Sequence, residues 1–279
     1  MKPVEPIFTS HLFPLLDEKL LEILRSLSPQ DWERQTIAPL WKVKDVAGHL
    51  LDGNMRALSM LRDNYFGEKP ENIDTYPDLV GYLNRLNADW VNAMQRVSPK
   101  VLIELLEITG KEYSMLMNTL NPFEKALFSV AWAGESESEN WFHIAREYTE
   151  KYHHQQQIRL AVGKEEVLLK KELYFPFLDT SLRALPHHYQ AINAEVGDVI
   201  QVTISSESGG DWYLYRNEEK WILVTECELA PICHISIPPE IAWRLFTKGI
   251  SREEAEPLIN IDGEKSYGSR IIDMLAVMA

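Results

Sequence analysis

The chain has 279 residues, of which 45% are hydrophobic and 25% are charged, and these proportions are those of an ordinary globular protein. They exclude intrinsic disorder as the main state, and they also exclude collagen, coiled-coil and disulfide-scaffold architectures. With 28 Lys and Arg against 42 Asp and Glu, the formal net charge of -14 argues against nucleic acids and anionic membranes as partners, because both require a basic surface.

The cellular context is indicated by the cysteines and by the apolar segments. Cys227 and Cys233 form neither a disulfide framework nor a C-x-x-C pair, which favours a reducing compartment with two inert thiols. The first ten residues lack the apolar stretch of a signal peptide, and no apolar run approaches the roughly 20 residues that span a bilayer. We therefore expect a soluble, cytoplasmic protein, and the length predicts two domains.

The first 165 residues have the periodicity of helices. Apolar residues from Phe13 to Leu27 recur every three or four positions, which predicts an amphipathic helix that ends before Pro29. A second helix is predicted after Trp41, with Val46, Leu50 and Met55 on its inner face and a stop near Gly67 and Pro70. Further helices are predicted over 76–97, 101–120 and 140–162. Four long helices joined by shorter connections, with an extra helix or two, indicate an up-down four-helix bundle.

The pattern changes after residue 165. The runs VIQVTIS, DWYLYR, KWILVTE and ICHISIP are rich in β-branched and aromatic residues and are separated by turn signals, which predicts an antiparallel meander. Helices are predicted over 239–247 and 252–257, a short strand over 258–261 and a final helix over 266–278. The sequence thus predicts an α+β two-domain protein, with a bundle over 1–165 and a small α+β domain with a mostly antiparallel sheet over 166–279.

The last predicted helix of the bundle carries a candidate metal site. Glu150 and His154 are four residues apart, so their side chains project from one helical face and can chelate one divalent ion. His49, on the inner face of the second helix, is the natural third ligand. Two histidines and one carboxylate leave open positions, as catalytic metal sites require. Gln157, one turn further on, is placed to hydrogen-bond a ligand or a bound water.

The spacing leaves two alternatives open. Glu and His occur four apart by chance in many helices, and an inward histidine is more often a hydrogen-bonded core residue than a ligand. His143 and Glu147 form a rival chelating pair on the same helix. His153 points about 100° away from His154, so we expect it at a surface or an interface.

Two motifs resemble those of the DinB/YfiT-like metalloenzymes. WKVKDVAGHL is similar to the family's second-helix signature, in which a metal-ligating His follows a Trp by eight positions. EKYHHQQQI is similar to the last-helix motif H-x-x-H-H-R-G-Q-I, with Glu150 in place of the first His, His154 at the second ligand and Gln157 at the Gln. The His/Glu/His pattern is that of the mycothiol-dependent maleylpyruvate isomerase branch, and Gln155-Gln156 departs from the usual R-G.

The C-terminal part supports the same resemblance. IAWRLFTKG and INIDGEKSYGSRIIDMLAVMA are similar to the sterol-carrier-like α+β domain of that branch. The resemblance implies a metal site of His49, Glu150 and His154, in which His143 and Glu147 are only neighbours. It also implies zinc or nickel as the metal and the addition or transfer of a low-molecular-weight thiol such as mycothiol, bacillithiol or glutathione. Related bundles often pair, so a homodimer is consistent with it.

The sequence therefore allows three possible functions. The first is a metal-dependent thiol S-transferase or maleylpyruvate-type isomerase that acts on a small molecule. An anionic substrate would need a local cation, for which Arg244 and Arg270 are candidates, although both are also typical surface salt-bridge residues. The second is a metal-dependent hydrolase on the same scaffold, and the third is a non-enzymatic protein that binds an apolar ligand in its C-terminal part. The sequence contains no nucleophile elbow, P-loop or dinucleotide fingerprint.

Overall fold

The computed structural model describes residues 1–68 and 73–278. The chain forms two compact units, and each unit draws on separate stretches of the sequence. The helical unit contains residues 9–121 and 150–165 together with Met278, and the sheet unit contains residues 1–8, 122–149 and 166–277. The last stretch of the sheet unit begins at residue 166, and the unit also includes the two earlier stretches. The division of the chain into domains over 1–165 and 166–279 stays a prediction.

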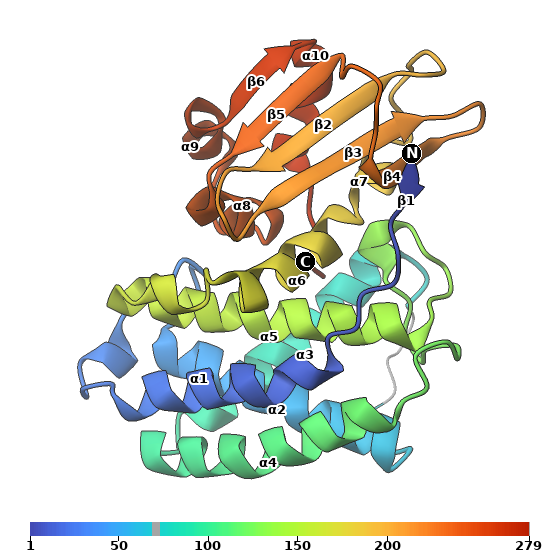
Figure 1. The fold of residues 1–279 in the computed structure, drawn as a ribbon. Helices are drawn as coiled ribbons and strands as arrows, with labels where there is room; N and C mark the ends of the chain where they lie inside the picture. The colour runs from blue at the N-terminus through green and yellow to red at the C-terminus, as the bar shows by residue number, and fades with distance from the viewer. Residues whose placement is uncertain (69–72, 279) are drawn as a thin grey trace. The chain divides into compact units, whose positions relative to one another are not determined.

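Long helices make up the helical unit. They are α1 (Phe13–Arg25), α2 (Val43–Ala57), α3 (Tyr76–Met94), α4 (Pro99–Thr119) and the second half of α5 (Asn140–Val162), as Figure 1 shows. All five begin and end close to their predicted positions except α2, which ends at Ala57 and continues as a π-helical turn over Leu58–Arg62 instead of reaching Gly67. The predicted stop at Pro70 lies outside the described residues.

Capping residues set the ends of these helices. The Thr75 hydroxyl accepts a hydrogen bond from the Asp78 amide, and the Asp78 carboxylate accepts one from the Thr75 amide, which forms a capping box at the start of α3. Ser98 caps α4 ahead of Pro99, the first residue of that helix. Gly163 follows α5 with a φ of +70°, a left-handed conformation that glycine adopts without strain.

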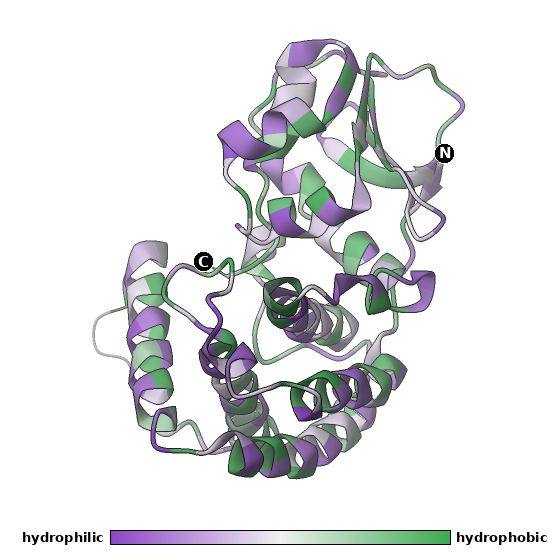
Figure 2. Cartoon of the chain, turned by 90° about the vertical axis from the view of Figure 1, so that its left-hand side faces the viewer, coloured by the Kyte–Doolittle hydropathy of each residue, from purple (hydrophilic) through white to green (hydrophobic). Residues whose placement is uncertain are grey.

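The core of the helical unit forms where the apolar faces of α1, α2, α4 and α5 meet. The alternation of hydrophobic and hydrophilic residues around these helices is visible in Figure 2. The prediction of a buried face holds for Val46 and Leu50 but is wrong for Met55, which is 41% exposed. The core cluster consists of Leu20, Ile23, Leu24, Trp32, Val43, Val46, Ala47, Leu50, Leu51, Leu102, Leu106 and Ile158.

A six-stranded, mostly antiparallel sheet forms the centre of the sheet unit. Its order is β1-β4-β3-β2-β5-β6, with β1 at one edge and β6 at the other (Figure 1). The strands are β1 (Lys2–Pro3), β2 (Val199–Ile204), β3 (Gly210–Arg216), β4 (Trp221–Glu226), β5 (Cys233–Ile237) and β6 (Asn260–Gly263). The antiparallel meander predicted for the four long strands is confirmed only for β2, β3 and β4.

The fourth long strand, β5, does not continue the meander. It lies parallel to β2, so that Val202 is opposite Ile235 and Ile204 is opposite Ile237. All four of these side chains are buried, which means that this register places the apolar residues of both strands on one covered face. The open edge of β4 is instead taken by β1, which the sequence did not predict.

Short helices complete the sheet unit: α6 (Lys171–Leu182), α7 (Leu185–His188), α8 (Pro239–Phe246), α9 (Arg252–Ala255) and α10 (Lys265–Gly268). The helices α8 and α9 were predicted, whereas α6 and α7 were not. The final helix predicted over 266–278 is wrong beyond residue 273, because α10 is followed only by a 3-10 turn over Ser269–Asp273. Further on, the Ala276 amide donates to the carbonyl of Phe246 and not to a helical partner.

Within the described part of the chain, no helix is both long and apolar enough to cross a membrane.

Candidate metal centre

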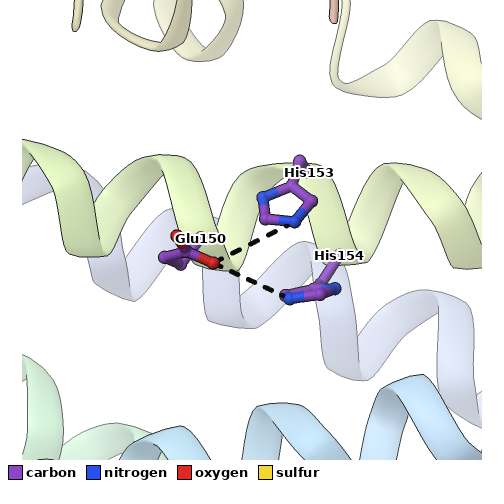
Figure 3. Close-up of side chains that lie close together, drawn as sticks. All are labelled: Glu150, His153 and His154. Atoms are coloured by element: carbon purple, nitrogen blue, oxygen red, sulfur yellow. Dashed lines mark ion pairs between the residues drawn. The ribbon is translucent and has the colours of Figure 1, made fainter. Parts of the chain in front are cut away.

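Three potential metal ligands lie together on the second half of α5. Oε2 of Glu150 is 3.8 Å from Nε2 of His154 and 4.0 Å from Nε2 of His153. Figure 3 shows both imidazoles beside the Glu150 carboxylate. One ligand atom from each of the three residues lies within 4.8 Å of the other two. This spacing allows a single divalent ion to contact more than one of them after small side-chain movements.

His49 reaches the same place from α2. Its imidazole ring lies 4.6 Å from the ring of His154 between centroids, with an angle of 74° between the planes. Nδ1 of His49 is buried and has no hydrogen-bond partner among the described residues. A buried polar atom without a partner is uncommon in native proteins, so it indicates that something absent from the chain itself binds there.

Trp41 forms an aromatic wall beside both histidines. Its ring lies 4.7 Å from that of His49 and 6.0 Å from that of His154. The residue follows the turn before α2, where the side chain of Asp45 accepts a hydrogen bond from the Lys42 amide and fixes the start of the helix. The eight-residue spacing from Trp41 to His49 thus places the indole and the imidazole in direct contact.

The electrostatics keep these imidazoles neutral. Burial lowers the pKa of His154 to about 3, with a smaller contribution from His153. Burial also lowers the pKa of His49 well below its usual range, and the nearby His154 and Arg56 lower it further. Neutral imidazole is the form that binds a metal ion, so both side chains are in the required protonation state at pH 7.

Gln157 contacts one of the histidines directly. Its Oε1 lies 3.0 Å from Nδ1 of His154. An amide oxygen only accepts hydrogen bonds, so this contact assigns the proton to Nδ1 and leaves the lone pair of Nε2 facing the Glu150 carboxylate. Gln157 therefore orients the imidazole, and its predicted hydrogen bond to a ligand or a bound water stays a prediction.

The rival pair His143 and Glu147 is engaged elsewhere. Nη2 of Arg146 lies 2.9 Å from Nδ1 of His143 and 2.5 Å from Oε1 of Glu147. This arrangement is a cation held between an imidazole and a carboxylate, and it belongs to the part of α5 that lies in the sheet unit.

The two predicted arginines also belong to the sheet unit. Arg244 lies on α8, where its Nε donates to the carbonyl of Glu240, and the carbonyl of Arg270 accepts from Nε2 of His188. Their role as cations for a substrate stays a prediction.

Sequence reasoning missed two features of the helical unit. His153, expected at a surface or an interface, is only 4% exposed and lies 4.0 Å from His154 between ring centroids. The second feature is the ion pair of Asp52 and Arg56, which follows His49 on α2. The spacing of His49, Asp52 and Arg56, by three and then four residues, was the signal that could have revealed it.

Comparisons with known proteins show which family the chain belongs to. The family described as mycothiol maleylpyruvate isomerase N-terminal domain matches residues 13–159, which is more than half of the chain. The chain belongs to this family. Its matched region includes the whole cluster of His49, Glu150, His153 and His154.

Two solved structures are similar to this member of the mycothiol maleylpyruvate isomerase family. One is the mycothiol-dependent maleylpyruvate isomerase, with a TM-score of 0.51, and the other is a mutant of that enzyme, with a TM-score of 0.50. Each is 9% identical, and each alignment covers 85% of this chain and 86% of the other. At this identity the similarity shows a shared fold with two parts. No curated protein matches the chain.

Proposed function

We propose that this protein is a metal-dependent enzyme that uses a low-molecular-weight thiol, as a thiol S-transferase or a maleylpyruvate-type isomerase. The observation that carries the proposal is the meeting of His49 on α2 with His154 on α5, beside the carboxylate of Glu150. The family match and the fold of the mycothiol-dependent isomerase support the thiol and the small-molecule substrate.

The residues present fit a divalent ion. His49, Glu150 and His154 would hold it, since two neutral imidazoles and one carboxylate are a donor set that zinc and nickel accept with positions left open. His49 has a buried, unpartnered nitrogen, and His154 directs Nε2 toward Glu150. His153 is the competing third ligand, but it directly precedes His154 on one helix, whereas His49 approaches the same place from a second helix.

The chain's own groups prepare the site for thiol chemistry. A bound divalent ion lowers the pKa of a coordinated thiol and so favours the thiolate, which is the nucleophile. Gln157 fixes the tautomer of His154, and the Trp41 ring packs beside the two imidazoles. Burial holds both imidazoles neutral, so they do not repel a cation.

Further parts of the proposal follow from the family. We assign residues 1–165 to a DinB/YfiT-like four-helix bundle and residues 166–279 to a sterol-carrier-like domain, with a homodimer as the assembly and the cytoplasm as the location. Mycothiol, bacillithiol and glutathione are the candidate thiols, and Arg244 and Arg270 remain candidate cations. Cys233 does not serve as a reactive thiol in this scheme, because burial raises its pKa to about 11.

The test is turnover of maleylpyruvate and of simple electrophiles by the zinc-loaded or nickel-loaded protein, measured with each of the three thiols and without thiol. The proposal predicts activity that requires a thiol and is lost with a chelator or in the His49→Ala variant. Turnover that ignores thiols would instead indicate a hydrolase that uses metal-bound water. Absence of any turnover, together with an apolar ligand bound in the sheet unit, would favour the non-enzymatic alternative.

A further inference from the structure

The face of α2 that carries His49 also carries an ion pair whose carboxylate, that of Asp52, is buried. His49, Asp52 and Arg56 are separated by three and four residues, a spacing that places their side chains on one side of the helix. Arg56 is seven residues beyond His49, which is about 10 Å along the helix axis. A flexible arginine at this distance can reach one end of a small molecule whose other end lies at His49.

The ion pair of Asp52 and Arg56 involves the inner nitrogen of the guanidinium. The Asp52 residue is buried, and its Oδ2 lies 2.9 Å from Nε of Arg56. The Arg56 side chain is 35% exposed, and among the described residues its Nη1 and Nη2 atoms make no hydrogen bond and no further ion pair. Asp52 thus pairs electrostatically with the inner nitrogen of the guanidinium, without a hydrogen bond between Oδ2 and Nε, and the outer N–H groups are left without a hydrogen bond among the described residues.

The two outer nitrogens of Arg56, Nη1 and Nη2, have the geometry to bind a carboxylate. Two parallel N–H groups bind the two oxygens of a carboxylate, and such charge-assisted pairs are stronger than neutral hydrogen bonds. Arg56 lies on the same face of α2 as His49, so its positive charge is on the side of the helix that faces the candidate metal centre. The net charge of -14 opposes an anionic ligand overall, so a local cation of this kind is required.

We propose that Arg56 binds a carboxylate of the ligand that occupies the site beside His49, and that Asp52 positions Arg56 for this role. The inference rests on the proposed function for the identity of the ligand, which is either the anionic substrate or the thiol compound. Binding requires only the exposed fork of Arg56, so it does not depend on chemistry at the metal.

The experiment is isothermal titration calorimetry of the zinc-loaded protein with two carboxylate probes. Maleate represents the substrate, and S-methylglutathione represents the thiol compound without a free thiol. We expect the Arg56→Gln variant to bind one of them at least about tenfold more weakly than the wild type, and Arg56→Lys to recover part of the loss. The probe that is affected identifies the source of the carboxylate.

Three controls make the result specific. Arg62→Gln removes an equal charge from an exposed arginine in the next turn and should leave binding unchanged. The neutral diamide of maleate should not distinguish the Arg56→Gln variant from the wild type. Zinc content and thermal unfolding should match in all variants, which excludes loss of the fold or of the metal.

The inference is overturned if the Arg56→Gln variant binds both carboxylate probes as tightly as the wild type, or if the wild type binds neither. Failure of the proposed function is a separate outcome: the wild type would show no thiol-dependent turnover, while the difference in carboxylate binding between the wild type and the Arg56→Gln variant would persist.

Discussion

Oε1 of Gln157 lies 3.0 Å from Nδ1 of His154, less than one helical turn away on α5. This contact decides which nitrogen of the imidazole carries the proton, and it directs the other nitrogen to Glu150. Partners of this kind, which bind the ligand residue and not the metal, are a regular part of metal sites because they raise the basicity of the histidine and fix its ring.

We therefore predict that Gln157→Leu weakens zinc binding by about 10- to 100-fold, the range typical for loss of a residue that supports a metal-ligating histidine. Competition with a chromophoric chelator measures the affinity. The matched control is Gln190→Leu, which changes an exposed glutamine in the sheet unit and should not alter zinc binding. An unchanged affinity in the Gln157→Leu variant would show that the contact does not support metal binding.

A largely buried ion pair between Lys151 of α5 and Asp17 of α1 joins these two helices. Nζ of Lys151 lies 2.8 Å from Oδ1 of Asp17 and 4.3 Å from the centre of the Tyr113 ring. Removal of one partner leaves a buried charge without compensation. We predict that Asp17→Ala lowers the free energy of unfolding by about 3–5 kcal/mol, measured by urea denaturation.

The double variant Asp17→Leu with Lys151→Met separates pairing from packing. Replacement of a buried ion pair by apolar residues of similar size is often close to neutral, so this variant should regain most of the stability lost in Asp17→Ala. If both variants lose the same amount, the loss reflects packing around Asp17 and the ion pair contributes little.

We predict that His143, a buried histidine of the sheet unit, makes the stability of the protein depend on pH. Burial and the charge of Arg146 lower its pKa from 6.5 to about 4 in the folded protein. Between these two values the unfolded chain binds a proton that the folded chain does not, so stability decreases as the pH falls from 6.5 to 4. The full loss from this one group is about 3 kcal/mol.

Urea denaturation of the wild type and of His143→Gln across this pH range checks the effect. The variant cannot take up the proton, so its stability should depend less on pH than that of the wild type. Parallel curves for the two proteins would show that His143 is not the group responsible.

The sequence predicted the helical unit well because its determinants are local. The leucine repeat of α1, the capping box of Thr75 with Asp78 and the glycine after α5 each act within one helix. The order of the strands was harder to predict. Whether β5 pairs with β4 or with β2 depends on which register buries Ile235 and Ile237, and this is decided by residues about 30 positions away.

Part of the candidate site was also predictable, because it depends on local spacing within single helices. Glu150 and His154 could be paired from their spacing on one helix, and a signature of the second helix pointed to His49. The burial of His153 and the role of Gln157 as a partner of His154 could not be foreseen from the spacing alone. Both depend on how α5 is covered and on which rotamers its side chains adopt in the folded protein.

The central claim is that His49, Glu150 and His154 hold one divalent ion. Mass-spectrometric metal analysis of purified wild type, His49→Ala, His154→Ala and His153→Ala after incubation with zinc and desalting tests it most directly. We predict one ion per chain in the wild type and in His153→Ala, and almost none in the other two variants. A wild type without stoichiometric metal, or a His49→Ala variant that retains the ion while His153→Ala loses it, would contradict the assignment.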